Sequence, residues 1–394
     1  MTMALISDKT RKFFEGRRGQ FRRLEAACRG VDNIVWVHSA SYGEFEEVRP
    51  VVNEIRRRRP EMKILVTFFS PSGYEYLKDD PVADWVFYLP LDLPGNARRF
   101  LDIVRPVKVI VSISDYWLGY LYGLRSRGID TYLVSARFTG DMFYFKPVGF
   151  LYKKAFKTCF TKILLRSDAY VKVLADNGIT DNVRVCGDPR MDRVAALASA
   201  QWKDGIVERW CAGEKVFVAG STLPKGDNAM IAELVNAHPF DRFLIVPHEI
   251  LADDIAVLRS SMNVPSVLYS EMENDAEADA LVLIVDKVGM LSKIYRYGFA
   301  AYVGGGFDGC PHSVIEPAVY GIPVFYGPQL GSNEHCSALL GRGGFAVADY
   351  AAMEEEYDRL KADASYLKRM GKSARRYCEE KSGAAGKIAD EILE

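Results

Sequence analysis

The chain has 394 residues, more than the ~250–300 at which a single hydrophobic core stops growing, and this length predicts two domains. A content of 49% hydrophobic and 26% charged residues excludes disordered, fibrous and collagen-like chains. The net charge of −1 provides no overall attraction to nucleic acid, so no nucleic-acid partner is expected.

The seven cysteines are widely spaced and form no CxxC motif. This pattern predicts free thiols in a reducing compartment, and no cysteine or histidine spacing indicates a metal site. Residues 1–6 are too short for the apolar core of a signal peptide, and no run of ~20 apolar residues predicts a membrane-spanning helix. We therefore expect a protein that is soluble or peripherally bound to a membrane.

Short apolar runs alternate with amphipathic stretches through the first half of the chain. Strands are predicted at 33–38, 63–67, 85–89, 107–112 and 131–135, and helices at 44–59, 71–77, 96–104 and 117–127. This alternation predicts a parallel sheet covered by helices.

The second half of the chain repeats the pattern. Strands are predicted at 215–219, 242–246, 281–285, 300–303 and 323–325, and helices near 229–236 and at 252–261. Two such units predict two Rossmann-like domains, at 1–200 and 201–394, whose parallel sheets face each other across a cleft. A glycine-containing break at 382–386 leaves the last helix free to pack back on the first domain.

A glycine-rich segment at 302–328 combines a strand, three consecutive glycines and a helix predicted to begin near 311–313. Glycines allow a ligand to approach the backbone closely, and a helix N-terminus favours phosphate. His312 and Glu316 would share one helix face, where a carboxylate can bind two ribose hydroxyls. The alternative is a turn followed by a packed helix without a ligand, but the combination favours a sugar-nucleotide site over residues 304–327.

The stretch HSASYGEFEE follows a predicted strand and opens a helix. Gly43 lies at the turn, and Glu44 falls in the first helical turn, at the carboxyl end of a parallel strand, where α/β active sites lie. A carboxylate at this place can act as the general base of a sugar transfer. The alternative is an acidic residue that complements the helix dipole, and Glu46 and Glu47 are expected to be solvated charges.

Several polar residues follow other predicted strands. Ser221 and Thr222 in AGSTLPKGD can hold a phosphate or cap a helix, and the stretch is not a P-loop. Asp92, Arg190 and His248 each follow a strand as well. Taken singly, a structural role is favoured for these three.

Residues 142–165 interleave aromatic side chains with five lysines. A helical stripe of Val148, Leu151, Ala155 and Cys159 is expected to be buried, which leaves lysines and some aromatics on the other faces. Such a segment suits an anionic membrane surface or an ordinary helix with solvated lysines. The basic residues within 9–23 add attraction for anionic lipid, ~1 kcal/mol each.

In their order and spacing, these segments resemble the family of 3-deoxy-D-manno-oct-2-ulosonic acid (Kdo) transferases of lipopolysaccharide synthesis. The matching stretches cover nearly the whole chain: GRRG, WVHSASYGE, TFFSPSGYE, YLPLDLPGNARRF, GDPRMD, AGST, VPHEI and VGGG followed by HSVIEPAVYGIPVFYGP. The resemblance implies a GT-B fold, CMP-Kdo as donor and lipid IVA, a lipid A precursor, as acceptor. It also implies inversion at the anomeric carbon without metal or cofactor, at the cytoplasmic face of the inner membrane.

The resemblance also assigns roles to individual residues. Glu44 would be the catalytic base. Donor binding would fall to Arg190, Ser221, Thr222, His248, Gly305, Gly306, His312, Ser313 and Glu316. The residues around the acceptor would be Ser41, Gly43, Asp92 and Asp115.

The sequence departs from the family pattern at several points. Ile113 replaces one member of an acidic pair that precedes Trp117, Asp115 stands where the other is Glu, and Ser313 stands where Asn follows the histidine. The longer apolar N-terminal anchor of many members has no counterpart, so membrane attachment would rest on the cationic and aromatic segments. Two alternatives stay open: another GT-B lipid glycosyltransferase or sugar-nucleotide epimerase with a UDP donor, and a non-catalytic nucleotide-binding homologue.

Overall fold

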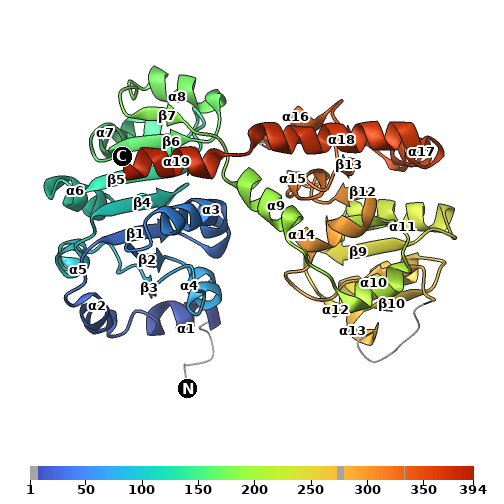
Figure 1. Ribbon diagram of the computed structural model, residues 1–394, viewed down its shortest axis with the longest axis horizontal. Helices are drawn as coiled ribbons and strands as arrows, with labels where there is room; N and C mark the ends of the chain where they lie inside the picture. Colours follow the sequence, from blue (N-terminus) through green and yellow to red (C-terminus); the bar gives the residue numbers. More distant parts are fainter. Residues whose placement is uncertain (1–7, 273–278, 332) are drawn as a thin grey trace. The chain divides into compact units, whose positions relative to one another are not determined.

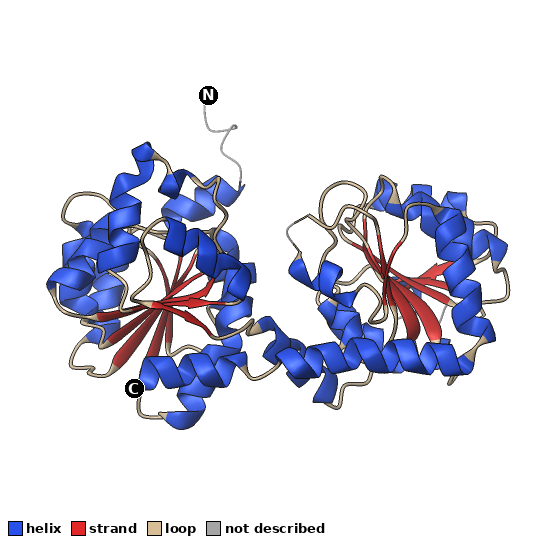
Figure 2. Ribbon diagram, turned by 90° about the horizontal axis from the view of Figure 1, so that it is seen from above, coloured by secondary structure: helices blue, strands red, loops and turns tan. Residues whose placement is uncertain are grey.

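The computed structural model describes residues 8–272, 279–331 and 333–394. The chain divides into two compact units, Met1–Arg193 with Ser382–Glu394 and Val194–Lys381. Each holds a seven-stranded sheet enclosed by helices (Figure 2), and the paired strands run parallel. The predicted α/β class with two Rossmann-like domains is therefore confirmed, whereas the cleft and the roles given to the two domains stay predictions.

The sheet of the first unit has the strand order β3-β2-β1-β4-β5-β6-β7. Chain order reverses between β1 and β4, which pair in parallel at the centre, so their carboxyl ends form a topological switch point. The strands are β1 (Ile34–Ser39), β2 (Lys63–Phe68), β3 (Trp85–Tyr88), β4 (Lys108–Ser112), β5 (Asp130–Ala136), β6 (Lys162–Leu165) and β7 (Val183–Val185).

Helices cover both faces of this sheet (Figure 1). The α-helices are α1 (Asp8–Glu15), α2 (Gln20–Cys28), α3 (Tyr42–Arg58), α4 (Pro71–Leu77), α5 (Asn96–Val104), α6 (Leu118–Ser126), α7 (Phe150–Thr158), α8 (Val171–Asp176), α9 (Arg190–Ser199), which crosses into the second unit, and α19 (Ala384–Leu393). Short 3-10 turns are η1 (Phe143–Phe145), η2 (Pro147–Gly149) and η3 (Asp168–Tyr170). The terminal helix α19 packs on α3, and the carboxylate of Asp192 accepts hydrogen bonds from the Gly383 and Ala385 amides at its start.

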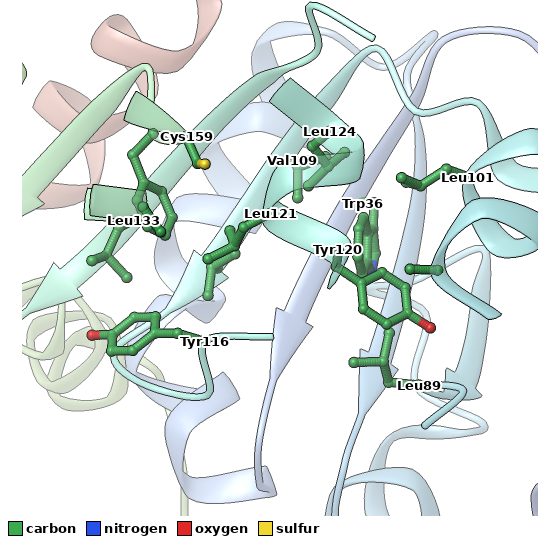
Figure 3. Close-up of a cluster of buried hydrophobic side chains, with 14 of the residues drawn as sticks. Trp36, Leu89, Leu101, Val109, Tyr116, Tyr120, Leu121, Leu124, Leu133 and Cys159 are labelled. Atoms are coloured by element: carbon green, nitrogen blue, oxygen red, sulfur yellow. The ribbon is translucent and has the colours of Figure 1, made fainter. Parts of the chain in front are cut away.

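Two apolar layers hold the first unit together, one on each face of the sheet. On one face Trp36, Tyr120, Leu121 and Leu133 pack within a single cluster (Figure 3). On the other, α3 buries an apolar stripe at spacings of three and four residues, which is the periodicity that predicted the helix: Phe45, Val48, Val51, Val52 and Ile55. Burial of this stripe locks the start of α3, and with it Glu44, at the switch point.

The sheet of the second unit has the order β10-β11-β9-β8-β12-β13-β14, with its switch point between β8 and β12. The strands are β8 (Val216–Thr222), β9 (Phe243–Pro247), β10 (Ser266–Leu268), β11 (Val282–Ile284), β12 (Gly298–Val303), β13 (Val324–Tyr326) and β14 (Gly344–Ala346). The helices are α10 (Gly205–Cys211), α11 (Asp227–Ala237), α12 (Ala252–Ser261), α13 (Tyr269–Met272), α14 (Leu291–Ile294), η4 (Tyr295–Tyr297), α15 (Ile315–Ala318), α16 (Glu334–Leu339), α17 (Tyr350–Ala362) and α18 (Ala364–Lys381). The core gathers around Phe217, Phe243 and Tyr357.

The aromatic and basic segment 142–165 folds differently from the predicted stripe. Val148 is 82% exposed and Leu151 is also exposed, whereas Ala155, Phe156 and Cys159 are buried. The reason is the helix start: η2 precedes α7, which begins only at Phe150, so the buried face is shifted by about one residue. The end of the segment is the buried strand β6 and not a surface helix.

No helix in the described ranges is both long and apolar enough to cross a lipid bilayer.

Candidate active site and donor site

Glu44 lies in the first turn of α3, at the switch point of the first sheet. Its Oε2 accepts a hydrogen bond from the Ala40 amide at 2.8 Å, and its Oε1 accepts one from the Ser114 hydroxyl at 2.7 Å. Ser41 caps the helix with its own hydroxyl, which accepts from the Glu44 amide at 3.5 Å. The carboxylate therefore closes the helix start, as the dipole interpretation predicts, and each oxygen still has a free lone pair.

A second carboxylate stands beside this one, on the loop after β4. Ser114 is flanked by Ile113 and Asp115, whose φ angles of 54° and 77° are rare for residues other than glycine. Asp115 Oδ2 lies 3.0 Å from Nε2 of His38, a ring that is only 2% exposed at the end of β1. Such backbone strain clusters at functional sites, and here it brings Ser114 onto Glu44 and Asp115 onto His38.

His38 is itself held from the other side. Its Nδ1 lies 2.9 Å from the Thr67 hydroxyl and 3.1 Å from the Thr67 carbonyl, and the Trp36 indole donates to the same hydroxyl at 2.8 Å. Both ring nitrogens therefore have partners, so the ring cannot rotate away from Asp115. The Asp115 Oδ1 atom accepts no hydrogen bond from the described residues.

The other acceptor candidates of the first unit have local structural roles. Gly43 is exposed in the first turn of α3. Asp92 Oδ2 accepts a hydrogen bond from the Gly119 amide at 2.8 Å, so it caps the start of α6. The structural role favoured for Asp92 is therefore present, and its predicted contact with an acceptor stays a prediction.

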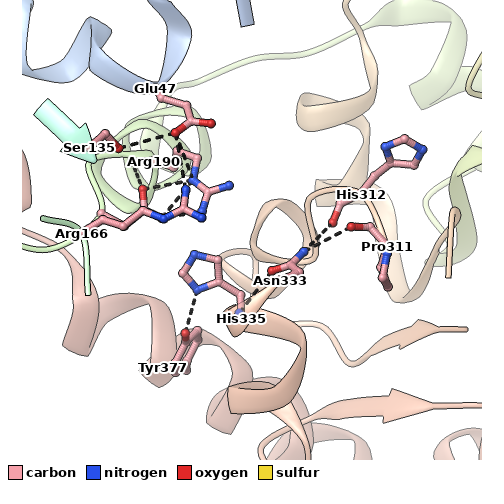
Figure 4. A network of polar contacts seen from close by, with 10 residues as sticks. Glu47, Ser135, Arg166, Arg190, Pro311, His312, Asn333, His335 and Tyr377 are labelled. Carbon is pink, nitrogen blue, oxygen red and sulfur yellow. Dashed lines mark hydrogen bonds and ion pairs between the residues drawn. The ribbon is translucent and has the colours of Figure 1, made fainter. Parts of the chain in front are cut away.

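Arg190, a predicted donor ligand, lies at the start of α9 in an ion-pair network of the first unit (Figure 4). Its Nε and Nη2 donate to the buried Asp188 carboxylate at 2.9 and 2.5 Å. Glu47 Oε2 lies 4.0 Å from Arg190 Nε and 3.6 Å from Arg166 Nη1. The expectation that Glu46 and Glu47 are solvated is wrong, because both are less than one-fifth exposed and pair with arginines, Glu46 with Arg49 and Arg193.

In the second unit, the buried carboxylate of Asp227 organises the switch point between β8 and β12. It accepts hydrogen bonds from the Leu223 amide at 2.9 Å, the Gly305 amide at 2.9 Å and the Tyr302 hydroxyl at 2.6 Å. Burial, and then the charge of Asp227, raise the pKa of Tyr302, so its hydroxyl stays protonated and donates. One carboxylate thus ties the loop after β8 to the glycine loop after β12.

Four of the predicted donor ligands meet around this carboxylate. The His248 amide donates to the Thr222 carbonyl at 3.0 Å, and the His248 ring stacks on His312 at 4.3 Å between centroids. Ser221 has a φ of 53°, and the buried Thr222 Oγ1 has no hydrogen-bond partner in the described parts of the chain. The two loops and both imidazoles therefore converge at the carboxyl ends of β8, β9 and β12.

Burial lowers the pKa of His312, and the neighbouring His248 lowers it further, while Asp227 acts in the opposite direction. The ring is therefore neutral at neutral pH, with Nε2 buried and without a partner in the described structure. A neutral imidazole at this place offers one donor or acceptor to a ligand without a charge that burial would penalise.

The predicted helix that starts near 311–313 is shorter than expected. Helix α15 covers only Ile315–Ala318, so His312 precedes it. The prediction that His312 and Glu316 share one helix face is therefore wrong. The loop is held instead by the side-chain amide of Asn333, whose Nδ2 donates to the Pro311 and His312 carbonyls, each at 3.2 Å (Figure 4). Ser313 precedes this short helix and Glu316 lies in its first turn, where the Glu316 amide donates to the Ser313 carbonyl.

The glycines of the loop serve the chain's own packing. A Cβ on Gly306 would lie 2.6 Å from the Gly327 amide nitrogen. Gly305 has a φ of 100°, and a Cβ there would lie 2.7 Å from the Cys310 carbonyl. These glycines are required by close backbone approach, so the glycine pattern alone does not demand a ligand.

The sequence interpretation did not identify several residues of these two sites. Ser114, His38 and Thr67 in the first unit, and Asp227 and Tyr302 in the second, contact the predicted residues. The available signal was their position just after, or at the end of, a predicted strand, because the carboxyl ends of neighbouring parallel strands share one sheet edge.

Comparison with known proteins supports the family that the motifs resemble. The sequence model described as "3-Deoxy-D-manno-octulosonic-acid transferase (kdotransferase)" matches residues 13–193. The 3-deoxy-D-manno-octulosonic acid transferase of Aquifex aeolicus is 29% identical over 308 residues, which cover 76% of this chain and 77% of that protein. The transferase of Haemophilus influenzae is 25% identical over 380 residues, which cover 90% and 86%.

The match over residues 13–193 and the relatives at 25–29% identity over most of the chain support the Kdo transferase family. Kdo transferases are glycosyltransferases, so the reaction class expected from the residues is confirmed. The resemblance to the family, which covered nearly the whole sequence, is confirmed as well.

Solved structures agree with the fold of this chain. A UDP-GlcNAc 2-epimerase from Neisseria meningitidis, bound to UDP-GlcNAc, superposes with a TM-score of 0.66 at 15% identity, over 91% of this chain and 99% of that one. A glycosyltransferase from Rickettsia africae gives a TM-score of 0.62 at 13% identity, over 92% and 98%. At such identities the likeness shows the fold alone, and the predicted GT-B class is confirmed.

Proposed function

We propose that this protein moves Kdo from CMP-Kdo to lipid IVA, with inversion at the anomeric carbon and without a metal. The observation that carries the proposal is the carboxylate of Glu44, fixed through Ala40 and Ser114 at the switch point of the first sheet. The likeness to the Kdo transferase family supports Kdo transfer in lipopolysaccharide synthesis. The choice of lipid IVA and CMP-Kdo rests on the resemblance of the motifs.

In the proposed reaction, an acceptor hydroxyl attacks the anomeric carbon of Kdo. Glu44 takes the hydroxyl proton as the new carbon–oxygen bond forms, and CMP leaves with the electron pair of the bond that breaks. A fixed carboxylate with a free lone pair on each oxygen suits this step, because proton transfer needs a base that is already in place. Asp115, clamped by His38, would orient the acceptor through its free Oδ1.

The second unit would hold the CMP. The hydroxyls of Ser221 and Thr222, the Gly306 amide and the neutral ring of His312 would supply neutral donors to a phosphate. Gly305, whose amide donates to Asp227, would let the backbone approach the ligand closely. His248, Ser313 and Glu316 complete the proposed donor ligands of this unit. Arg190, in the first unit, stays a proposed donor ligand through the resemblance alone. Glu316 would bind the ribose from its place on α15.

The enzyme, incubated with CMP-Kdo, lipid IVA and excess EDTA, is expected to add one or more Kdo residues to the lipid and to release one CMP for each. Mass spectrometry of the lipid and chromatography of the nucleotide measure the two products. Replacement of CMP-Kdo by UDP-GlcNAc is the matched control and should give no product. A lipid of unchanged mass with CMP-Kdo would contradict the proposal, and activity that EDTA abolishes would contradict its metal-free part.

We also propose that the protein binds the cytoplasmic face of the inner membrane through η1, η2 and the start of α7. Four apolar side chains are exposed together there: Phe143, Val148, Phe150 and Leu151. Lys146, Lys154 and Lys157 are exposed in the same segment. Exposed aromatics beside lysines suit the interface of an anionic bilayer.

The Phe150→Ser variant is expected to bind anionic vesicles about tenfold more weakly than the unaltered protein, because Phe150 is 63% exposed and loses its apolar contact with lipid. Sedimentation with vesicles that contain phosphatidylglycerol measures the binding at low and high salt. Phe240→Ser is the matched control, since Phe240 is exposed in the second unit and its loss should change nothing. Equal binding of the two variants would contradict the membrane surface.

A further inference from the structure

A pocket of about 570 Å³ opens in the first unit, outside the residues assigned above. It lies where α2 and α5, which pack side by side (Figure 1), both begin. Its lining includes Arg17, Gln20, Phe21, Arg22, Asn96 and Arg99. The lining has three arginines and no acidic residue, so the pocket has the charge of an anion site.

The positive charge of this pocket is mostly uncompensated. Arg17 donates to the carbonyls of Leu89, Phe13 and Phe69 at 2.8 to 3.0 Å, and to no carboxylate. Burial lowers the pKa of Arg17 to about 10, which leaves it cationic at neutral pH. The side chain of Arg22 forms no hydrogen bond or ion pair with the described residues, and of the three arginines only Arg99 has an acidic partner, Glu25 at 3.0 Å.

The two helix starts add to this potential. Neither α2 nor α5 has a side-chain cap or an acidic residue in its first turn, so the positive ends of both dipoles are unopposed. Each of these helices has nine residues. Two uncapped helix starts at one pocket suit a phosphate, whose oxygens accept from backbone amides.

An independent observation points to a ligand. Gln20 is 5% exposed, lines the pocket, and its Oε1 has no hydrogen-bond partner in the described parts of the chain. A buried amide without a partner destabilises a protein, so such groups are nearly always paired. A hydroxyl next to a phosphate, as on a phosphorylated sugar, would supply the missing donor.

The pocket adjoins the edge of the sheet where Glu44 lies. Phe69, whose carbonyl accepts a hydrogen bond from Arg17, directly follows β2. The centroid of the Phe69 ring lies 5.2 Å from that of Trp117, which is two residues beyond Asp115. At the rim, Leu93 is 56% exposed. A phosphorylated head group at the pocket would therefore leave the rest of its molecule free to extend along the active-site edge.

We propose that this pocket binds a phosphate monoester on the sugar head group of the lipid acceptor. The identity of the acceptor rests on the proposed function, whereas the phosphate site rests on the pocket itself. Arg22 and the helix starts would hold the phosphate, and Gln20 a neighbouring sugar hydroxyl. A free sugar phosphate has the same chemistry, so the test separates the two sources.

The binding arm uses the full chain saturated with CMP, so that the donor site is occupied, and titrates glucose 1-phosphate by calorimetry. Arg22→Glu is expected to weaken binding at least about tenfold, because a charge-assisted bond becomes a repulsion. Its fold should persist, since an acidic residue in the first turn favours the helix dipole. Arg29→Glu, at the other end of α2, is the matched control and should bind as the unaltered protein does. Unphosphorylated glucose should not bind.

The Gln20→Leu variant distinguishes a ligand-binding role of Gln20 from a purely structural role. It removes the unpartnered amide, so the unliganded protein should be at least as stable as before, while glucose 1-phosphate binding falls. The proposal that this pocket binds a sugar phosphate would be overturned if Arg22→Glu and Arg29→Glu bind glucose 1-phosphate equally well. It would also be overturned if Gln20→Leu keeps full affinity.

The kinetic arm uses lipid IVA before and after enzymatic removal of its phosphates. Arg22→Glu should raise KM for the phosphorylated lipid with kcat unchanged, and should leave the dephosphorylated lipid unaffected. If Arg22→Glu loses glucose 1-phosphate binding but keeps the KM for the phosphorylated lipid, the pocket does not bind the lipid acceptor. The pocket would then be assigned to a free sugar phosphate. Absence of any Kdo transfer would count against the proposed function alone, because the binding arm needs no turnover.

Discussion

Glu44→Gln is expected to lower Kdo transfer by a factor of about 10² to 10⁴, the usual contribution of a general base. Glutamine keeps an oxygen that can accept from the Ala40 amide, so the start of α3 should stay closed. It cannot take the acceptor's proton at neutral pH, and kcat should fall while the affinity for CMP is unchanged. Single-turnover kinetics with CMP-Kdo and calorimetry with CMP measure the two quantities.

Glu54→Gln is the matched control for this variant. Glu54 lies on the same helix and pairs with Arg57 and Arg58 near the surface, so its loss should leave turnover within about twofold and cost about 0–1 kcal/mol of stability. If Glu44→Gln retains the turnover of Glu54→Gln, Glu44 is not the base and has only the capping role of the dipole interpretation. Asp115 would then be the next carboxylate to test at this edge.

Asp227→Ala is expected to reduce the free energy of unfolding of the second unit by about 3–5 kcal/mol, because three buried donors lose their partner at once. Those donors are the Leu223 and Gly305 amides and the Tyr302 hydroxyl. The affinity for CMP should fall as well, since the glycine loop is no longer tied to the loop after β8. Urea unfolding followed by hydrogen exchange localises the loss, and calorimetry measures CMP binding.

Tyr302→Phe serves as the control for Asp227→Ala. It removes one of the three hydrogen bonds and leaves Asp227 with both amides, so it should cost about 1 kcal/mol and keep CMP affinity nearly unchanged. An Asp227→Ala variant no less stable than Tyr302→Phe would show that the carboxylate is not the tie between the two loops.

Much of the secondary structure could be predicted locally. Helices α4, α5 and α12 have the bounds that their apolar spacing and flanking residues predicted. Strands β6, β7, β10 and β14 were not predicted, since they have only three or four residues and little local signal. Apolar spacing also did not predict where α7 begins. The predicted buried stripe was therefore about one residue out of phase, and Val148 and Leu151, which were expected to be buried, are exposed.

The residues of the two candidate sites also could be predicted only in part from the sequence. The order of polar motifs after predicted strands was sufficient to name Glu44, Ser221, Thr222 and His312 as candidates, because the carboxyl ends of parallel strands share an edge. Asp115 was named through the resemblance to the family. The order of motifs was not sufficient to pair the residues. Asp115 is 77 residues from His38 and Gly305 is 78 from Asp227, so only the strand order brings each pair into contact.

The sequence by itself determined the α/β class, the two parallel-sheet units and the resemblance to Kdo transferases, because periodicity and motif order are properties of the chain. The tertiary structure alone decided how the pieces act on one another. Strain in the loop 113–115 places one hydroxyl on Glu44 and one carboxylate on His38. The packing of α2 beside α5 makes a cationic pocket that no contiguous motif encodes, since helix starts far apart in sequence meet only when the sheet closes the core between them.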